Sequence, residues 1–325
     1  MHSVHLPPAD RGEVECRLYW VGHEKTSRDG TKCNNLGIGA LLAFVKLSRP
    51  HFLLGGVLLF ALGSAAAGDI SWIDYSLGQA MVGVMQITAH FVNEYADREV
   101  DRSVGHRTMF SGGSGVLVLG DLRPEVALWA AWISSTAGVI LAIVVAFVSP
   151  LAATIGLVTL TVSWIYSMPP IRLLATGWGE LATSLVVVVA VPTIGWAVQR
   201  APVNTALWWA AGILLPVHLA MMLAFELPDL ESDAAAGKRV LGVRLGEARS
   251  RRLITTMLLV AAATAAIGPT VSGISPEVRW AIPAGLLPAL ILLKTIHSRN
   301  HAASTLAAVS TLAVVAGTLV LVVSA

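Results

Sequence analysis

The stretch Asn93-Glu94-Tyr95-Ala96-Asp97-Arg98-Glu99-Val100-Asp101 decides how this sequence is understood. It ends an apolar run that begins near Leu77. A second stretch, Asp229-Leu230-Glu231-Ser232-Asp233, ends another apolar run that begins near Ala206. Both contain Asp-x-Glu-x-Asp, and these two five-residue patterns together hold six of the 20 acidic residues in a chain of 325. The plainer interpretation is that both stretches are ordinary charged loop ends in water. That interpretation explains a single pattern of this kind more readily than two matching patterns.

The spacing within each pattern predicts metal chemistry. Aspartates four positions apart share one face of a helix, where like charges repel unless a cation lies between them. Carboxylate oxygens suit hard divalent cations, and Mg²⁺ is commonly shared between a few carboxylates and substrate phosphates. We therefore predict a facing pair of Mg²⁺–diphosphate sites at one end of a membrane bundle. The residues predicted to hold the metal are Asn93, Asp97, Asp101, Asp229 and Asp233.

The composition predicts a membrane protein. The chain is 55% hydrophobic and 13% charged, whereas soluble domains are about 25% charged. A helix needs roughly 20 apolar residues to cross a bilayer. The hydrophobic runs then predict an all-α integral membrane protein with about nine transmembrane helices, near 50–67, 76–96, 125–147, 151–167, 179–198, 206–227, 253–271, 279–296 and 303–324.

The first 36 residues are polar and contain turn-forming pairs such as Pro7-Pro8 and Asp29-Gly30. They lack the order of regions that defines a signal peptide. The sequence predicts a polar cytoplasmic tail over 1–36 and a polytopic membrane domain over 37–325. A short helix near 38–48 is expected to lie on the membrane surface.

The basic residues predict the orientation. With the N-terminus inside, 20 of the 22 Lys and Arg residues fall on cytoplasmic segments, and only Arg200 and Arg279 fall outside. Positive charge concentrates on the cytoplasmic side of membrane proteins. Both acidic stretches are therefore expected inside and the C-terminus outside, in what we expect to be a bacterial cell membrane.

Basic residues near the acidic stretches predict the contacts of a diphosphate. Guanidinium groups match phosphate oxygens in a bidentate manner, and ammonium groups also bind phosphate. A loop containing Gly112, Gly113 and Gly115 is expected to close over the site. The residues predicted to contact the diphosphate by charge are Arg107, Arg172, Lys238 and Arg239.

These residues carry a resemblance to a known family. The spacing Asn93-x₃-Asp97-x₃-Asp101, with Glu94 in place of an aspartate, is similar to the first motif of the UbiA superfamily of intramembrane prenyltransferases. Arg107 and Ser111-Gly112 resemble the residues that follow that motif. The second motif and its tail are similar to 229–246, and the Tyr-Ser-x-Pro-Pro-x-Lys/Arg segment is similar to 166–172.

The resemblance implies nine helices around a central cavity, Mg²⁺, and a polyprenyl diphosphate donor with a small aromatic or lipid acceptor. The tail at 236–246 most resembles the branch that prenylates 1,4-dihydroxy-2-naphthoate, the menaquinone precursor. The motif matches also imply that Tyr166 contacts the donor and that Glu180 is catalytic on the acceptor side, although Glu180 is equally suited to capping a helix.

Two other functions remain open from the sequence. A membrane terpene cyclase of the same superfamily would act on a prenyl diphosphate alone. A secondary transporter would place ionisable pairs at mid-membrane, whereas these pairs lie at helix ends on one face. The sequence gives no indication of a nucleic-acid partner, and the expected environment is membrane lipid.

Overall fold

The computed structural model describes residues 19–21, 24–26, 36–103, 112–202, 205–271, 281–298 and 300–324. The chain divides into two compact units, Met1–Ala43 and Phe44–Ala325. In the first unit, strands β1 (Tyr19–Val21) and β2 (Glu24–Thr26) pair in antiparallel fashion, with Trp20 opposite Lys25. The boundary between a tail ending at residue 36 and a membrane domain stays a prediction.

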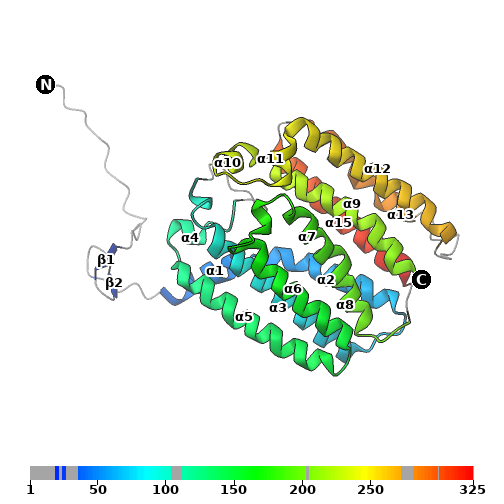
Figure 1. Cartoon of the computed structure of the whole chain (residues 1–325), viewed down its shortest axis with the longest axis horizontal. Coiled ribbons are helices and arrows are strands. Elements are labelled where there is room, and N and C mark those ends of the chain that lie inside the picture. Colours follow the sequence, from blue (N-terminus) through cyan, green and yellow to red (C-terminus); the bar gives the residue numbers. More distant parts are fainter. Residues whose placement is uncertain are drawn as a thin grey trace, which may run out of the picture. The chain divides into compact units, whose positions relative to one another are not determined.

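The second unit is built from helices (Figure 1). In chain order, the longer elements are α2 (Leu53–Ala66), α3 (Trp72–Asp97), α5 (Pro124–Ala146), α6 (Pro150–Ser167), α7 (Gly179–Leu185) continued by η4 (Val186–Ala190) and α8 (Val191–Ala197), α9 (Thr205–Glu226), α12 (Glu247–Val271), α13 (Ala281–Gly285), α14 (Leu287–Thr295) and α15 (His301–Val323). The connecting elements are η1 (Pro50–Phe52), η2 (Asp101–Ser103), α4 (Val116–Leu119), η3 (Leu173–Ala175), α10 (Leu230–Ala235) and α11 (Leu241–Leu245). Helix α1 (Leu36–Leu47) begins in the first unit.

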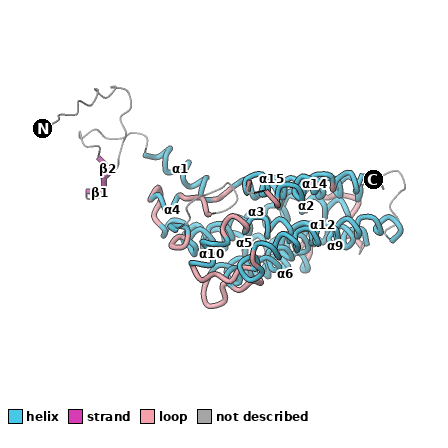
Figure 2. Tube along the Cα trace, turned by 90° about the horizontal axis from the view of Figure 1, so that it is seen from above, coloured by secondary structure: helices cyan, strands magenta, loops and turns pink. Residues whose placement is uncertain are grey.

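The long helices form two packed groups joined by α2. Helix α3 packs against α5 and α6, α9 packs against α12 and α15, and α2 packs against both α8 and α15. Figure 1 shows α3, α5 and α6 along one side and α9, α12 and α15 along the other. Figure 2 shows these helices running along a common direction. Large apolar side chains such as Phe60, Met85 and Leu214 are buried between them.

Apolar side chains also cover the outside of the bundle. On α5, Trp129 and Ile133 are 67% and 68% exposed. Such surface is costly in water and ordinary against lipid, where every backbone group must be satisfied within the helix. The outer face of α5 is therefore suited to contact with lipid tails.

Six helices of the described chain are long and apolar enough to cross a membrane. They are Pro124–Ala146, Pro150–Ser167, Gly179–Ala197, Thr205–Glu226, Glu247–Ile267 and His301–Val323. A seventh is counted if the bent pair Ile38–Leu47 and Pro50–Ala66 makes one span. The predicted helical fold is confirmed, but the predicted count of nine spans is not.

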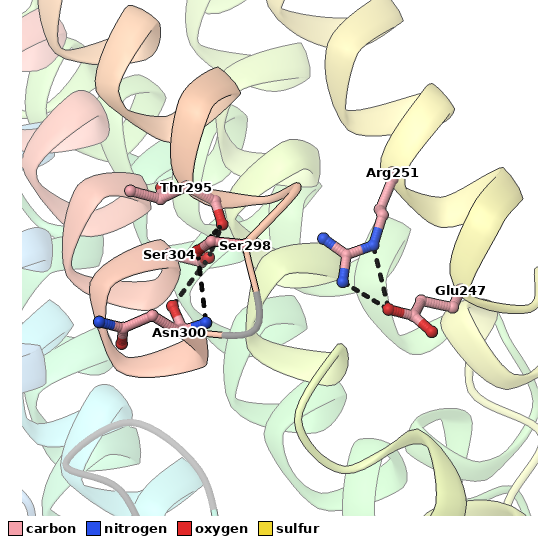
Figure 3. A network of polar contacts seen from close by, with 6 residues as sticks. All are labelled: Glu247, Arg251, Thr295, Ser298, Asn300 and Ser304. Carbon is pink, nitrogen blue, oxygen red and sulfur yellow. Dashed lines mark hydrogen bonds and ion pairs between the residues drawn. The ribbon is translucent and has the colours of Figure 1, made fainter.

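Local sequence explains where several helices begin and end. The Ser149 hydroxyl accepts a hydrogen bond from the Ala152 amide at 3.2 Å, ahead of α6, as an N-cap serine does. Serine hydroxyl groups also hold the turn from α14 to α15 (Figure 3). There the Ser304 hydroxyl donates to the Thr295 carbonyl at 2.9 Å, and the Asn300 amide donates to the Ser298 hydroxyl at 3.3 Å.

Helices α2 and α8 approach so closely that glycine is required. A Cβ atom on Gly63 would lie 1.8 Å from the carbonyl oxygen of Pro192, and one on Gly195 would lie 2.3 Å from that of Phe60. The Ser64 hydroxyl donates to the Gly195 carbonyl at 3.0 Å in the same contact. Small residues of this kind allow membrane helices to bring their backbones together.

Candidate functional site

The first acidic motif lies where α3 ends. Asp97 is buried, and its carboxylate accepts hydrogen bonds from Asn93 Nδ2 at 3.0 Å and from an Arg172 guanidinium nitrogen at 3.3 Å. The same Asn93 amide reaches the Ser167 hydroxyl at 3.3 Å. Asp101 begins η2 and is also buried. Asn93 and Asp97 therefore share a face at the end of α3, as predicted, whereas Asp101 lies beyond that helix, in η2, where the charge of Asp97 acts on it. The end of α6 and the loop that follows it supply the neighbours of this pair.

The second motif follows α9. Asp229 precedes α10, and its carbonyl accepts a hydrogen bond from the Asp233 amide at 2.8 Å. The Asp233 carboxylate lies 3.3 Å from Lys238 Nζ, and its carbonyl accepts from the Lys238 amide at 2.9 Å. The basic residue predicted to follow this motif is thus folded back onto it.

Lys238 connects the two motifs. Its side chain is 12% exposed, and its charge acts on Asp97 and Asp101 as well as on Asp233. Burial by itself lowers the pKa of Lys238, but the carboxylates of Asp97, Asp233 and Asp101 together outweigh burial and raise it. A single ammonium group therefore interacts with carboxylates that are more than 130 positions apart in the sequence.

Negative charge is crowded around Asp101. Burial, followed by repulsion from Asp97 and Glu94, raises the pKa of Asp101 to about 7. Like charges at short range inside a protein disfavour ionisation in this way. Arg49, Arg172 and Lys238 bring positive charge to the neighbouring carboxylates of Glu94, Asp97 and Asp233.

The donor set fits Mg²⁺ by its chemistry. Asp97, Asp101 and Asp233 offer carboxylate oxygens, and the Asn93 amide, whose nitrogen is engaged, leaves its oxygen available. These are the hard oxygen ligands that Mg²⁺ prefers, often with waters and phosphates completing its shell. Within the described ranges, no group of three Asp, Glu, His or Cys side chains is arranged to hold a metal ion by itself. Ligation would require Arg172 and Lys238 to release carboxylate oxygens.

Glu94 has a different role from its neighbours, which the sequence did not reveal. It is 3% exposed, and its carboxylate accepts hydrogen bonds from the Ser114 amide at 2.6 Å and the Ser114 hydroxyl at 2.7 Å. An Arg49 guanidinium nitrogen lies 3.9 Å away, on a residue with a left-handed backbone conformation. Glu94 therefore anchors the glycine-rich loop. In the sequence, the only indication of this role was that a glutamate stands where the similar family motif has an aspartate.

The glycine-rich loop lies against the first motif. Gly113 has φ +69°, and a Cβ atom there would lie 2.2 Å from an Asp101 carboxylate oxygen. Only glycine combines this backbone conformation with this close approach. The loop residues Gly112–Gly115 thus cover Asp101, in the position expected from the sequence.

The other predicted residues differ in how closely they join this cluster. Tyr166 on α6 hydrogen-bonds Thr183 and is within electrostatic reach of Glu180 and Asp97. Glu180 is 2% exposed at the start of α7. The Arg239 side chain is exposed, and its amide donates to the Ala175 carbonyl at 3.2 Å. Arg107 and Ser111 lie outside the described residues.

The fold is that of a helical integral membrane protein, and acidic side chains of two distant segments cluster around Lys238. A family model, the UbiA prenyltransferase family, matches residues 53–322. The chain therefore belongs to the UbiA prenyltransferase family, as its motifs predicted, and is a prenyltransferase.

Two similar sequences have assigned activities. The 1,4-dihydroxy-2-naphthoate octaprenyltransferase of Bacillus subtilis is 24% identical over 225 residues, which cover 66% of this chain and 70% of the relative. The enzyme of the same name from Mycobacterium tuberculosis is 28% identical over 229 residues, which cover 67% of this chain and 75% of the relative.

Solved structures share the fold at low sequence identity. A digeranylgeranylglyceryl phosphate synthase structure has a TM-score of 0.65 at 14% identity and covers 88% of this chain and 99% of its own. A UbiA homologue from Archaeoglobus fulgidus bound to GPP and Mg²⁺ has a TM-score of 0.59 at 19% identity and covers 84% of this chain and 99% of its own. These likenesses confirm the all-helical membrane fold.

Proposed function

We propose that this protein transfers a prenyl group from a polyprenyl diphosphate to an aromatic quinone precursor within the membrane, with Mg²⁺ as its cofactor. The observation that carries the proposal is the meeting of both acidic motifs at Lys238, whose ammonium group interacts with carboxylates of each motif. The names of the two similar sequences support 1,4-dihydroxy-2-naphthoate as the acceptor. The Archaeoglobus fulgidus homologue bound to GPP and Mg²⁺ supports the donor class and the metal.

Different residues of the chain contribute to ionisation of the prenyl diphosphate. Bound Mg²⁺ would neutralise the diphosphate and stabilise the negative charge that builds on it as it leaves. The proposed ligands are Asn93, Asp97, Asp101, Asp229 and Asp233. Once the donor is present, Arg172 and Lys238 exchange their carboxylate partners for diphosphate oxygens, which guanidinium and ammonium groups bind. Arg107, Arg239 and Tyr166 remain predicted donor contacts.

Transfer then needs an acceptor held in place and water kept out. The bond from the allylic carbon to oxygen breaks, an electron-rich ring carbon forms the new bond, and that carbon loses its proton. Placement of the prenyl chain among the helices protects the cation-like carbon from water. The loop held by Glu94 over Asp101 would exclude water on the polar side.

The test is turnover by purified protein in lipid nanodiscs. With geranylgeranyl diphosphate, MgCl₂ and 1,4-dihydroxy-2-naphthoate, we expect prenylated naphthoate and diphosphate, and no product after chelation of Mg²⁺. Replacement of the acceptor by 4-hydroxybenzoate identifies the acceptor class. A cyclised hydrocarbon formed without any acceptor would contradict transfer and establish a terpene cyclase.

Lys238→Ala tests the observation that carries this proposal. Loss of a charged hydrogen bond costs about 1.5–3 kcal/mol, so the variant should raise the KM for the donor at least about tenfold. Arg249→Ala is the matched control, because Arg249 is exposed on α12, away from the motifs. Equal kinetics in the two variants would contradict a role for Lys238 in donor binding.

A further inference from the structure

Two acidic side chains that the proposed reaction does not require meet beneath the basic segment of the second motif. Glu180 is buried at the start of α7, and Glu226 is the last residue of α9. Their carboxyl groups lie within hydrogen-bonding reach of each other. Two ionised carboxylates would repel at this distance in a buried place, so the contact needs an explanation.

Each carboxyl group also binds one amide of α11. The Leu241 amide donates to Glu180 Oε1 at 2.9 Å, and the Gly242 amide donates to Glu226 Oε2 at 2.6 Å. A Cβ atom on Gly242 would lie 2.6 Å from Glu226 Oε2, so glycine permits this approach. One oxygen of each carboxyl group is therefore occupied by a backbone N–H.

The other carboxyl oxygen of Glu180 indicates that a proton lies between the two groups. Glu180 Oε2 is buried, and among the described residues no N–H or hydroxyl donor reaches it. A buried acceptor without a donor is costly. A proton held between the Glu180 and Glu226 carboxyl groups supplies the donor that this oxygen lacks.

The segment held by this pair carries Lys238. On either side of the pair's contacts, the Arg239 amide donates to the Ala175 carbonyl at 3.2 Å, and the Arg244 guanidinium donates to the Thr176 carbonyl at 3.1 Å. Lys238 itself contacts Asp233. The position of the Lys238 ammonium group thus depends on how residues 239–244 are seated.

We infer that Glu180 and Glu226 share one proton and act together as positioning residues, which seat the segment after the second motif so that Lys238 lies between the acidic motifs. The part of this inference that concerns the diphosphate rests on the proposed function. Glu180, predicted from the sequence as catalytic on the acceptor side, then acts through Lys238 rather than on the acceptor.

Glutamine substitutions test the shared proton. In Glu226→Gln, the amide oxygen accepts from Gly242 and the NH₂ group donates to Glu180, so one donor remains between the two groups. Glu180→Gln preserves the contact in the same way. The double variant places two NH₂ groups against each other. Glu226→Leu removes the contact, and Glu231→Gln, at an exposed position of α10, is the control.

Thermal unfolding of the full chain in nanodiscs, without ligand, is the first measurement. We expect each single glutamine variant and Glu231→Gln to unfold near the wild-type temperature. The double variant should unfold at least about 3 °C lower, because a buried donor loses its acceptor. An infrared band of a protonated carboxylic acid present in the wild type should disappear in Glu226→Gln.

Binding of inorganic diphosphate with Mg²⁺, measured by calorimetry, is the second measurement. Glu226→Gln should bind as the wild type does, whereas Glu226→Leu should bind at least about tenfold more weakly. Losses in the double variant that equal the sum of the single losses would overturn the shared proton. Unchanged binding in a folded Glu226→Leu would overturn the positioning role. A wild type that binds no diphosphate, with the unfolding pattern as expected, would overturn the proposed function instead.

Discussion

At the scale of the residue, basic side chains hold the acidic side chains of the site together. Asp97, Asp101 and Asp233 are held close together by Arg172 and Lys238. The sequence predicted the carboxylates because their spacing along one helix is visible in it. Which basic residues neutralise Asp97 was not predictable, because Arg172 and Lys238 lie 75 and 141 positions from it in the sequence.

Asp101→Asn should separate stability from activity. The variant removes a buried charge that Asp97 and Glu94 repel, so its unfolding temperature without Mg²⁺ should be unchanged or a few degrees higher (about 2–4 °C per kcal/mol). Turnover should be nearly abolished, since a proposed metal ligand is lost. A protein that unfolds more readily and remains active would show that Asp101 is structural.

Glu94→Asp tests the anchor of the glycine-rich loop. Aspartate is one methylene shorter and should lose both contacts to Ser114, at a cost of about 1–3 kcal/mol in stability. Ser114→Ala removes only the hydroxyl contact and should cost less. Chemical unfolding and protection of the Ser114 amide from hydrogen exchange measure both effects. Protection in Glu94→Asp equal to that of the wild type would contradict the anchor.

At the scale of the element, close backbone approach fixes how helices meet. The apolar runs predicted most helices to within a few residues, because hydrophobicity and proline positions are local signals. The contact of α11 with Glu180 and Glu226 was not predictable, since it joins α7 and α9 to Leu241, which lies 61 positions after Glu180. The contact of α2 with α8 was likewise not predictable, because it joins Gly63 and Gly195, which are far apart in the sequence.

Gly63→Ala tests the contact of α2 with α8. The added methyl group would meet the Pro192 carbonyl, so the helices must separate, at a cost of about 1–3 kcal/mol. Gly83→Ala is the matched control, because a Cβ atom there has open space and alanine favours a helix by about 1 kcal/mol. Unfolding in detergent should show a lower midpoint for the first variant and no loss for the second.

At the scale of the whole molecule, the family fold brings two distant motifs to one end of the helices. The composition predicted a membrane protein, and the family confirms it. The predicted orientation rests on the distribution of lysine and arginine along the sequence. It is tested by fusing a reporter after Asp101 and another after Asp233. Both should report the cytoplasm, and an external signal from either would contradict the predicted orientation.

The central claim is that both acidic motifs make one Mg²⁺–diphosphate site. The most direct measurement is the rise in unfolding temperature when Mg²⁺ and inorganic diphosphate are added to wild type, Asp97→Asn, Asp233→Asn and the control Glu231→Gln. Ligands that bind the folded state stabilise it by about 2.7 kcal/mol at one hundred times their Kd. The account predicts this rise in the wild type and the control and its loss in both aspartate variants. A full rise in either aspartate variant would contradict the single shared site.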